Sequence, residues 1–274
     1  MKKSQMVWIV GLFLVVINVL FYFFGIGGEN VLALVSDLFP IITVVVAGIG
    51  LAAAFKSFQE FDATKISWML LLVGIILFFG GESIYAILEL IFKFDMNETF
   101  PTIADYSWLA GYIPLFAGLA MLIYGYKKSG FPFGNTKAYT ILSTVFIVIT
   151  GGLIYLLLIP IIKDPETSVF AKFVYLFYPI GDLFLIIPAG FLLYITYLFG
   201  RGSVSRPWKY IAAGFIAMTI ADILYSYLGW VGLYSAGNAS TYIDVAWNAG
   251  YLLIGLGGFY QMELIQSCKT RREA

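Results

Sequence analysis

Residues 141–162 read ILSTVFIVITGGLIYLLLIPII and contain no charged side chain. An α-helix of this length crosses about 30 Å of hydrocarbon, at about 1.5 Å per residue. The apolar residues do not alternate with polar ones, which argues against the strands of a membrane β-barrel. Because a backbone in lipid must satisfy its hydrogen bonds within the segment, the run predicts a transmembrane helix.

Similar runs recur along the chain. Hydrophobic residues make up 61% of it and charged residues 12%, against roughly 45–50% and 25% in soluble domains. We therefore expect an all-α polytopic membrane protein, a single integral membrane domain whose first partner is the lipid bilayer. The predicted spans are about 7–27, 31–54, 66–92, 103–126, 138–162, 169–199, 208–233 and 242–266.

The composition also excludes several kinds of chemistry. The chain has no histidine and one cysteine, Cys268. Imidazole metal sites, histidine-dependent hydrolysis, intrachain disulfides and thiolate clusters are thereby excluded. The net charge is zero, so no nucleic-acid partner is expected. We expect no cofactor and no enzymatic activity, and the sequence leaves a metal site undetermined.

Basic residues predict the orientation. With eight spans, both termini lie on one side of the membrane. Thirteen basic residues fall on that side and three on the other, namely Lys93, Lys163 and Lys172. The positive-inside rule then predicts a cell-membrane protein with both termini in the cytoplasm. The thirteen are Lys2, Lys3, Lys56, Lys65, Lys127, Lys128, Lys137, Arg201, Arg206, Lys209, Lys269, Arg271 and Arg272.

The chain also contains an internal repeat. A pattern of Thr, Asp, Trp, Gly, Tyr and Gly occurs twice at an offset of 139 positions, first at Thr102, Asp105, Trp108, Gly111, Tyr112 and Gly118 and again at Thr241, Asp244, Trp247, Gly250, Tyr251 and Gly257. Phe39-Pro40-Ile41 and Tyr178-Pro179-Ile180 keep the same offset, and Glu82 and Tyr85 match Asp222 and Tyr225 at 140. We expect two four-helix repeats, residues 1–135 and 136–274. Because four spans return the chain to its starting side, the repeats are parallel.

Acidic residues within the predicted spans are the candidate site. Carboxylates inside a membrane are costly and indicate function by default. Asp105 and Asp244 have a second interpretation, because Thr102-x-x-Asp105 and Thr241-x-x-Asp244 have capping-box spacing. Each aspartate also shares a helix face with a tryptophan and a tyrosine, so it can both cap a helix and line a site.

Glu82 and Asp222 lie too deep to cap a helix. They are either buried carboxyl groups bonded to a neighbouring helix or a site for a cation, proton or amine. Tyr85, Tyr225 and Trp230 are close enough in sequence to form aromatic walls around a cation. Pro179 and Gly181 precede Asp182 and favour a local opening of that helix, which would expose carbonyl ligands. The candidate ligand-binding residues are Glu82, Asp222, Asp105, Asp244, Asp182, Tyr85, Tyr225, Trp108 and Trp247, and none is assigned as catalytic.

Residues 100–112, FPTIADYSWLAGY, resemble a stretch in the multi-spanning N-terminal membrane modules of prokaryotic signalling proteins. Those modules are often fused to GGDEF, EAL or histidine-kinase output domains. The resemblance implies a membrane sensor or scaffold module. The sequence continues only briefly past its last apolar run, so a sensor role would involve a separate signalling or membrane protein.

Two functions remain open from the sequence. The first is a sensor-like or accessory module that binds a cation or small amine in an outward-facing acidic and aromatic pocket between the repeats. The second is a small-solute or proton-coupled transporter, which duplicated halves and membrane carboxylates would also suit. An intramembrane metal-dependent enzyme ranks last, because the sequence has no clustered metal-ligand motif.

Overall fold

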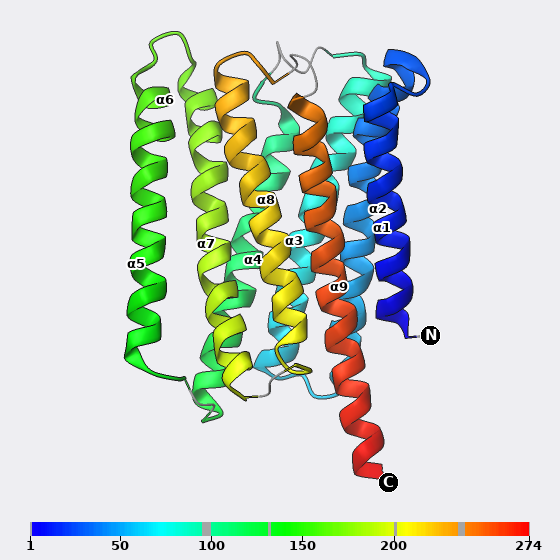
Figure 1. Ribbon diagram of the computed structural model, residues 1–274, viewed down its shortest axis with the longest axis vertical. Coiled ribbons are helices and arrows are strands. Elements are labelled where there is room, and N and C mark those ends of the chain that lie inside the picture. The colour runs from blue at the N-terminus through cyan, green and yellow to red at the C-terminus, as the bar shows by residue number, and fades with distance from the viewer. Residues whose placement is uncertain (1, 95–99, 131–132, 200–201, 235–238, 274) are drawn as a thin grey trace.

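The computed structural model describes residues 2–94, 100–130, 133–199, 202–234 and 239–273, and the regular structure in these ranges is helical (Figure 1). The all-α prediction is confirmed. Of the basic residues used to predict the orientation, Arg201 lies outside the described ranges. The elements are α1 (Lys3–Phe24), α2 (Gly28–Ser57), α3 (Ala63–Ala86), the π-helical η1 (Ile87–Ile91), α4 (Ile103–Lys128), α5 (Thr136–Leu153), the π-helical η2 (Ile154–Leu158), α6 (Ile159–Lys163), α7 (Val169–Phe199), α8 (Arg206–Trp230) and α9 (Ala239–Glu273).

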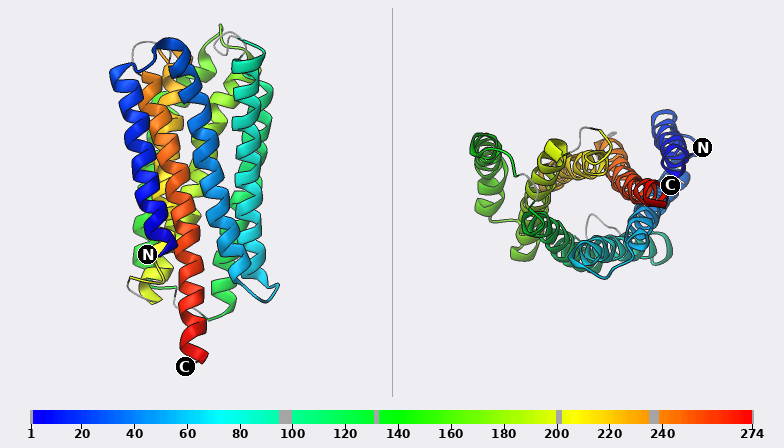
Figure 2. Two further views of the ribbon diagram at one scale, coloured as in Figure 1. Left: turned by 90° about the vertical axis from the view of Figure 1, so that its right-hand side faces the viewer. Right: turned by 90° about the horizontal axis from the view of Figure 1, so that it is seen from below.

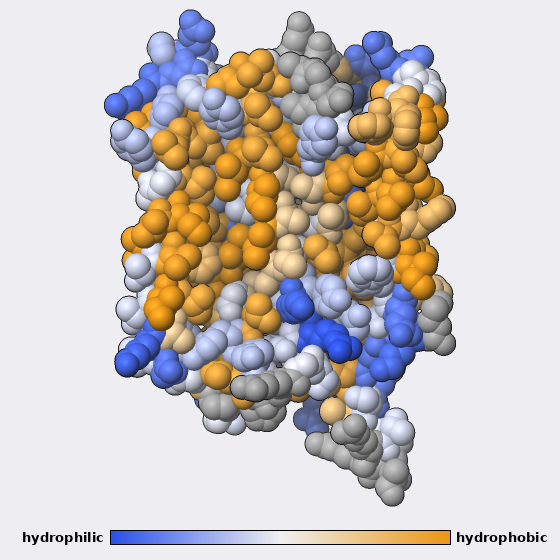
Figure 3. Space-filling view, in the orientation of Figure 1, coloured by the Kyte–Doolittle hydropathy of each residue, from blue (hydrophilic) through white to orange (hydrophobic). Residues whose placement is uncertain are grey.

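The long helices run up and down side by side, and both termini lie at the same end of the bundle (Figure 1). Apolar residues cover the middle of the visible face, and hydrophilic residues gather towards both ends (Figure 3). In the part of the chain that the structure describes, seven helices are long and apolar enough to cross a membrane, which confirms a multi-pass protein. The eighth membrane-length helix, α9, does not meet that criterion. It packs against α1, α2 and α8, so much of its surface faces protein and a continuous apolar surface is not required.

Six helices form a closed ring. The packed pairs around it are α2 with α3, α3 with α4, α4 with α7, α7 with α8, α8 with α9, and α9 with α2. Figure 2 shows the ring end-on, with α1 and α5 outside it on opposite sides. α1 is attached to α9 by side-chain hydrogen bonds, including that from the Ser4 hydroxyl to Glu263. None of the residues of α5 is buried, and the helix is joined to α7 through η2 and α6.

Glycines set the helix spacing at two crossings in the ring. In α3 and α4, a Cβ at Gly74 would lie 2.9 Å from the Gly111 carbonyl oxygen. In α8 and α9, a Cβ at Gly214 would lie 2.8 Å from the Gly250 carbonyl oxygen. A backbone approach this close leaves no room for a larger residue. The two crossings therefore use glycine in the same way.

The crossing of α2 and α9 is tighter still. A Cβ at Gly258 would overlap the backbone of Gly50. We expect Gly258→Ala to lower the free energy of unfolding by about 1–3 kcal/mol, as overpacking does elsewhere. Thermal unfolding in detergent measures the change. Gly151→Ala on α5 is the matched control, since its Cβ would meet no atom within 4 Å. Equal unfolding temperatures for the two variants would contradict this account of the crossing.

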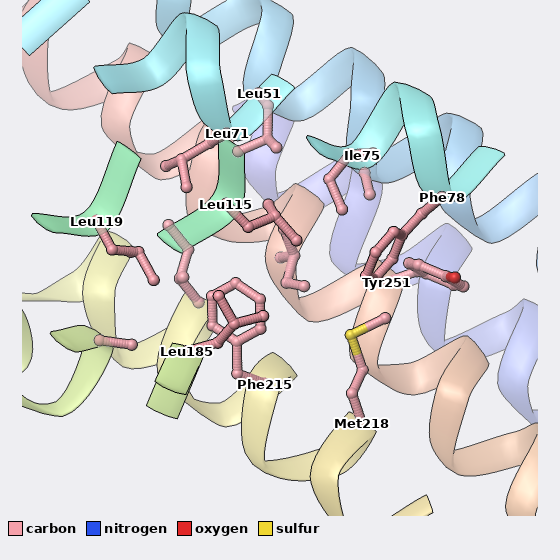
Figure 4. Packing of buried hydrophobic residues seen from close by; sticks show 14 of the residues in the cluster. Leu51, Leu71, Ile75, Phe78, Leu115, Leu119, Leu185, Phe215, Met218 and Tyr251 are labelled. Atoms are coloured by element: carbon pink, nitrogen blue, oxygen red, sulfur yellow. The ribbon is translucent and has the colours of Figure 1, made fainter. Parts of the chain in front are cut away.

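The half of the ring nearest the termini is filled with buried side chains. Trp68 of α3 and Trp208 of α8 lie against each other there, with ring centroids 5.4 Å apart. The pair belongs to a cluster of buried residues, whose leucine and phenylalanine side chains pack against one another in Figure 4. The fully buried members include Leu51, Leu71, Leu115, Leu119, Leu185 and Phe215. These buried side chains fill the bundle interior on the side of the termini.

Candidate functional site

A cavity of about 1000 Å³ occupies the half of the ring opposite the termini. It extends from Phe78, Met218 and Tyr251, which rest on the solid core, to Lys93 and Tyr234 near the connecting loops. Six carboxyl side chains line it: Asp37, Glu82, Glu89, Asp105, Asp222 and Asp244. Eight tyrosines and two tryptophans also line it: Tyr22, Tyr85, Tyr112, Tyr175, Tyr178, Tyr225, Tyr234, Tyr251, Trp108 and Trp247. Among the described lining residues, Lys93 is the one basic side chain.

Eight of the nine residues predicted from the sequence thus lie in one cavity. They are Glu82, Asp222, Asp105, Asp244, Tyr85, Tyr225, Trp108 and Trp247. The ninth, Asp182, does not line the cavity. It lies directly behind Asp222 and is only 2% exposed.

The two deep acids are held by tyrosines from opposite parts of the chain. The Tyr251 hydroxyl of α9 donates to Glu82 of α3 at 2.5 Å. The Tyr112 hydroxyl of α4 donates to Asp222 of α8 at 3.1 Å. The Phe78 ring contacts both tyrosine rings, with centroid distances of 5.4 Å to Tyr112 and 6.4 Å to Tyr251. Figure 4 shows Phe78 beside Tyr251. Glu82 and Asp222 therefore share one space, each bound to a donor from the other half of the sequence.

Indole groups also donate hydrogen bonds to these two acids. The Trp247 Nε1 donates to Asp222 at 2.6 Å, and Trp108 is a hydrogen-bond donor to Glu82. Trp108 fits because Gly81 has no Cβ, which would lie 2.5 Å from the indole nitrogen. Tyrosine and tryptophan donors are neutral. The hydrogen bonds orient both carboxyl groups and bring no compensating charge.

Asp105 fulfils the predicted capping role and also lines the cavity. Its carboxylate accepts from the Thr102 amide at 2.6 Å, and the Thr102 hydroxyl accepts from the Ala104 amide. Its other oxygen accepts from the Tyr178 hydroxyl of α7 at 2.6 Å. The capping box therefore fixes the carboxyl group at the start of α4, with one oxygen turned to the bundle interior.

The same capping prediction for Thr241 and Asp244 is wrong. α9 begins at Ala239, so Thr241 already lies inside the helix. Asp244 accepts instead from the Tyr22 hydroxyl of α1 at 2.7 Å and from the Tyr234 hydroxyl at 3.3 Å. The Asp244 carboxyl group therefore does not cap α9. It links α9 to α1 through Tyr22.

The predicted opening of the helix before Asp182 is also wrong. α7 is continuous from Val169 to Phe199. A Cβ at Gly181 would lie 2.9 Å from the Tyr112 ring. Gly181 therefore provides room for the Tyr112 ring to pack against α7 and does not break the helix. The tyrosine hydroxyl then reaches Asp182 at 2.9 Å.

Of the predicted aromatic walls, two residues are placed as expected and one is not. Tyr85 packs on Trp108, and Tyr225 packs on Trp247, with centroid distances of 5.9 and 5.6 Å. Trp230 lies outside the cavity lining and donates its indole N–H to Asp164, in the loop between α6 and α7, at 2.7 Å. Bonds from the Thr167 hydroxyl, the Glu166 amide and this indole lower the pKa of Asp164 to about 2.

The sequence did not predict the tyrosines contributed by α1 and α7. Tyr22, Tyr175 and Tyr178 enter the cavity from helices without a Thr-Asp-Trp motif. For Tyr178 the sequence held a signal, because Tyr178-Pro179-Ile180 repeats Phe39-Pro40-Ile41. Asp37 also lines the cavity, and its place inside the predicted span 31–54 was a signal; it is 4% exposed, and no described residue donates to its buried Oδ2.

Comparison with protein families, curated proteins and solved structures finds no match. Within the described ranges, no group of three or more His, Cys, Asp or Glu side chains is arranged to hold a metal ion. The function is therefore argued from the cavity itself.

Proposed function

We propose that the cavity binds an organic cation, with an ammonium group held between Glu82 and Asp222 and an apolar body against the aromatic walls. The observation that carries the proposal is a cavity whose described lining holds six carboxyl groups and one basic residue, Lys93, at its outer end. Carboxyl groups placed in a membrane without opposite charges are costly unless function retains them. A bound cation supplies the missing charge.

The aromatic lining favours an ammonium ion over a small metal ion. Tyrosine and tryptophan faces attract cations within about 6 Å of the ring centroid, and aromatic cages recognise quaternary ammonium groups. A cavity of about 1000 Å³ is far larger than a metal ion needs and fits the usual range for small-molecule sites. Asp37 supports a ligand as well, because its buried Oδ2 lacks a donor and the side chain lines the cavity.

We propose a sensor-like or accessory role for this binding. The buried core that includes Phe78 and Met218 borders the cavity on the side of the termini, which suits ligand detection. A small-solute or proton-coupled transporter remains the second candidate, favoured by the contact between the Asp182 and Asp222 carboxyl groups in mid-bundle. In either role no residue is assigned to catalysis.

The proposed architecture is two parallel four-helix repeats, residues 1–135 and 136–274, with both termini in the cytoplasm. The glycine contacts support the repeat, since Gly74 and Gly111 meet as Gly214 and Gly250 do. The crosswise bonds of Tyr112 and Tyr251 also support it. The basic residues and the shared end of the termini support the orientation. The cavity would then open to the outside.

A sensor of this kind would pass its state to a partner. The resemblance of residues 100–112 to membrane modules of signalling proteins supports a separate signalling or membrane protein as that partner. Occupation of a cavity built from both repeats would alter how α3 and α4 sit against α8 and α9. A partner that contacts the cytoplasmic ends of these helices could detect the change.

Calorimetric titration in detergent tests the proposal. Tetramethylammonium and benzyltrimethylammonium are the probes, and benzenesulfonate is an anion of similar size to the latter. We expect saturable binding of at least the aromatic cation and none of the sulfonate. Absence of binding by both cations up to about 10 mM, where even millimolar affinity would be detected, would overturn the proposal.

A further inference from the structure

We infer that the contact between Asp182 and Asp222 is a proton site, and that binding of the cation in the cavity releases its proton to the outside solution. The inference rests on the proposed function and adds that a proton is exchanged for the bound cation. It identifies one pair of side chains as the source.

The geometry requires a proton between these two groups. The carboxyl groups of Asp182 and Asp222 meet at one hydroxyl group, that of Tyr112. Two ionised carboxylates contain only acceptors, so both can hydrogen-bond at this hydroxyl only when one of them carries a proton. The Tyr112 hydroxyl lies 2.9 Å from Asp182 and 3.1 Å from Asp222, yet its single hydrogen can serve only one of them at a time.

No other donor fills this role at Asp182. Its Oδ2 is buried, and no hydroxyl or N–H group of the described residues donates to it. The indole N–H of Trp247 is directed to Asp222. A proton shared with Asp222 is the donor that the geometry leaves for Asp182.

The charged and titratable groups around the pair are acids and phenols. They are Asp37 of α2, Glu82 of α3, Asp105 and Tyr112 of α4, Tyr178 of α7, Tyr225 of α8, and Asp244 and Tyr251 of α9. Lys93, the basic residue of the described lining, lies at the outer end. In the empty cavity a proton is therefore the available neutralising charge at this depth.

A cation can take the place of that proton. Asp222 lines the cavity and Asp182 lies behind it, so a cation at Asp222 is next to both carboxylates. Its charge stabilises the doubly ionised pair, and the O–H bond of the pair breaks. The proton leaves through the cavity, so one positive charge enters as one departs.

The pair occurs only in the second half of the chain. At the offset of 139 positions, Asp182 matches Thr43 of α2. The Thr43 hydroxyl donates to the Asn248 side-chain oxygen at 2.9 Å, and threonine carries no carboxyl group to share a proton. Glu82 therefore lacks a carboxyl partner, and one proton, not two, is expected per bound cation.

Calorimetry in two buffers of different ionisation enthalpy measures protons released per cation bound. Benzyltrimethylammonium is the probe, because it is permanently charged and carries no proton of its own. We expect a ratio near one for the wild type. Asp182→Asn removes the shared proton and should bring the ratio close to zero. Glu82→Gln should bind the cation more weakly while keeping the ratio near one.

Infrared difference spectra of the wild type give a readout independent of the variants. Cation binding should remove a protonated-carboxyl band and add carboxylate bands. Binding without proton release, or an undiminished ratio in Asp182→Asn, would overturn the inference and leave the proposed function intact. Absence of cation binding by the wild type would overturn the proposed function, and the inference would fall with it.

Discussion

Combined replacement of Glu82 by Gln and Asp222 by Asn is expected to weaken binding of benzyltrimethylammonium by about a hundredfold or more. A pair of opposite charges about 4 Å apart contributes about 4 kcal/mol at an effective dielectric constant of 20, part of which desolvation offsets. A net loss of about 2.8 kcal/mol is a hundredfold. The amides keep the side-chain shape and still accept from Tyr251 and Trp247.

The matched control removes two acids that do not line the cavity. Glu29 and Glu60 are exposed, and Glu29→Gln with Glu60→Gln changes the net charge by the same amount. This variant should bind the cation as the wild type does. The cavity variant should also unfold at no lower temperature than the wild type, because it loses uncompensated charges in the membrane. Unchanged affinity in the cavity variant would contradict the role of these acids.

Thiol labelling should differ completely between the two ends of the bundle. Ser240 lines the cavity, whereas Cys268 is exposed on α9 near its C-terminal end. In intact cells, a membrane-impermeant maleimide should label Ser240→Cys in a Cys268→Ser background and leave the wild-type Cys268 unlabelled. Permeabilised cells should show labelling of Cys268 as well. The reason is the proposed positive-inside orientation, in which the cavity would open to the outside.

Ligand protection makes the labelling specific to the cavity. Benzyltrimethylammonium should slow the labelling of Ser240→Cys and leave that of Cys268 in permeabilised cells unchanged. Labelling of Cys268 in intact cells would show that the orientation is inverted.

The sequence predicted the helices and most of the acidic site, for physical reasons. Long apolar runs can only be helices in lipid, so each predicted span has a helix in the structure. Acids in such runs are rare, and those that occur face the interior because lipid excludes them. Composition and spacing therefore marked Glu82 and Asp222 as candidate interior acids, whereas their position in one shared cavity comes from the structure.

What the sequence missed depends on contacts between helices distant in the chain. The spacing of Thr241 and Asp244 favours a cap, but Tyr22 and Tyr234 supply donors, and α9 starts earlier. Gly181 has the local signature of a helix break, yet it is a contact surface for Tyr112. In both cases a contact with a residue distant in the sequence decides the role of the residue. The local sequence spacing does not predict such a contact.

The most direct test is anomalous diffraction from crystals grown with 4-bromobenzyltrimethylammonium. A bromine peak inside the cavity, with the ammonium group between Glu82 and Asp222 and the ring near Trp108 and Trp247, is the predicted result. A cavity without a peak, in crystals where calorimetry shows the site saturated, would contradict the account.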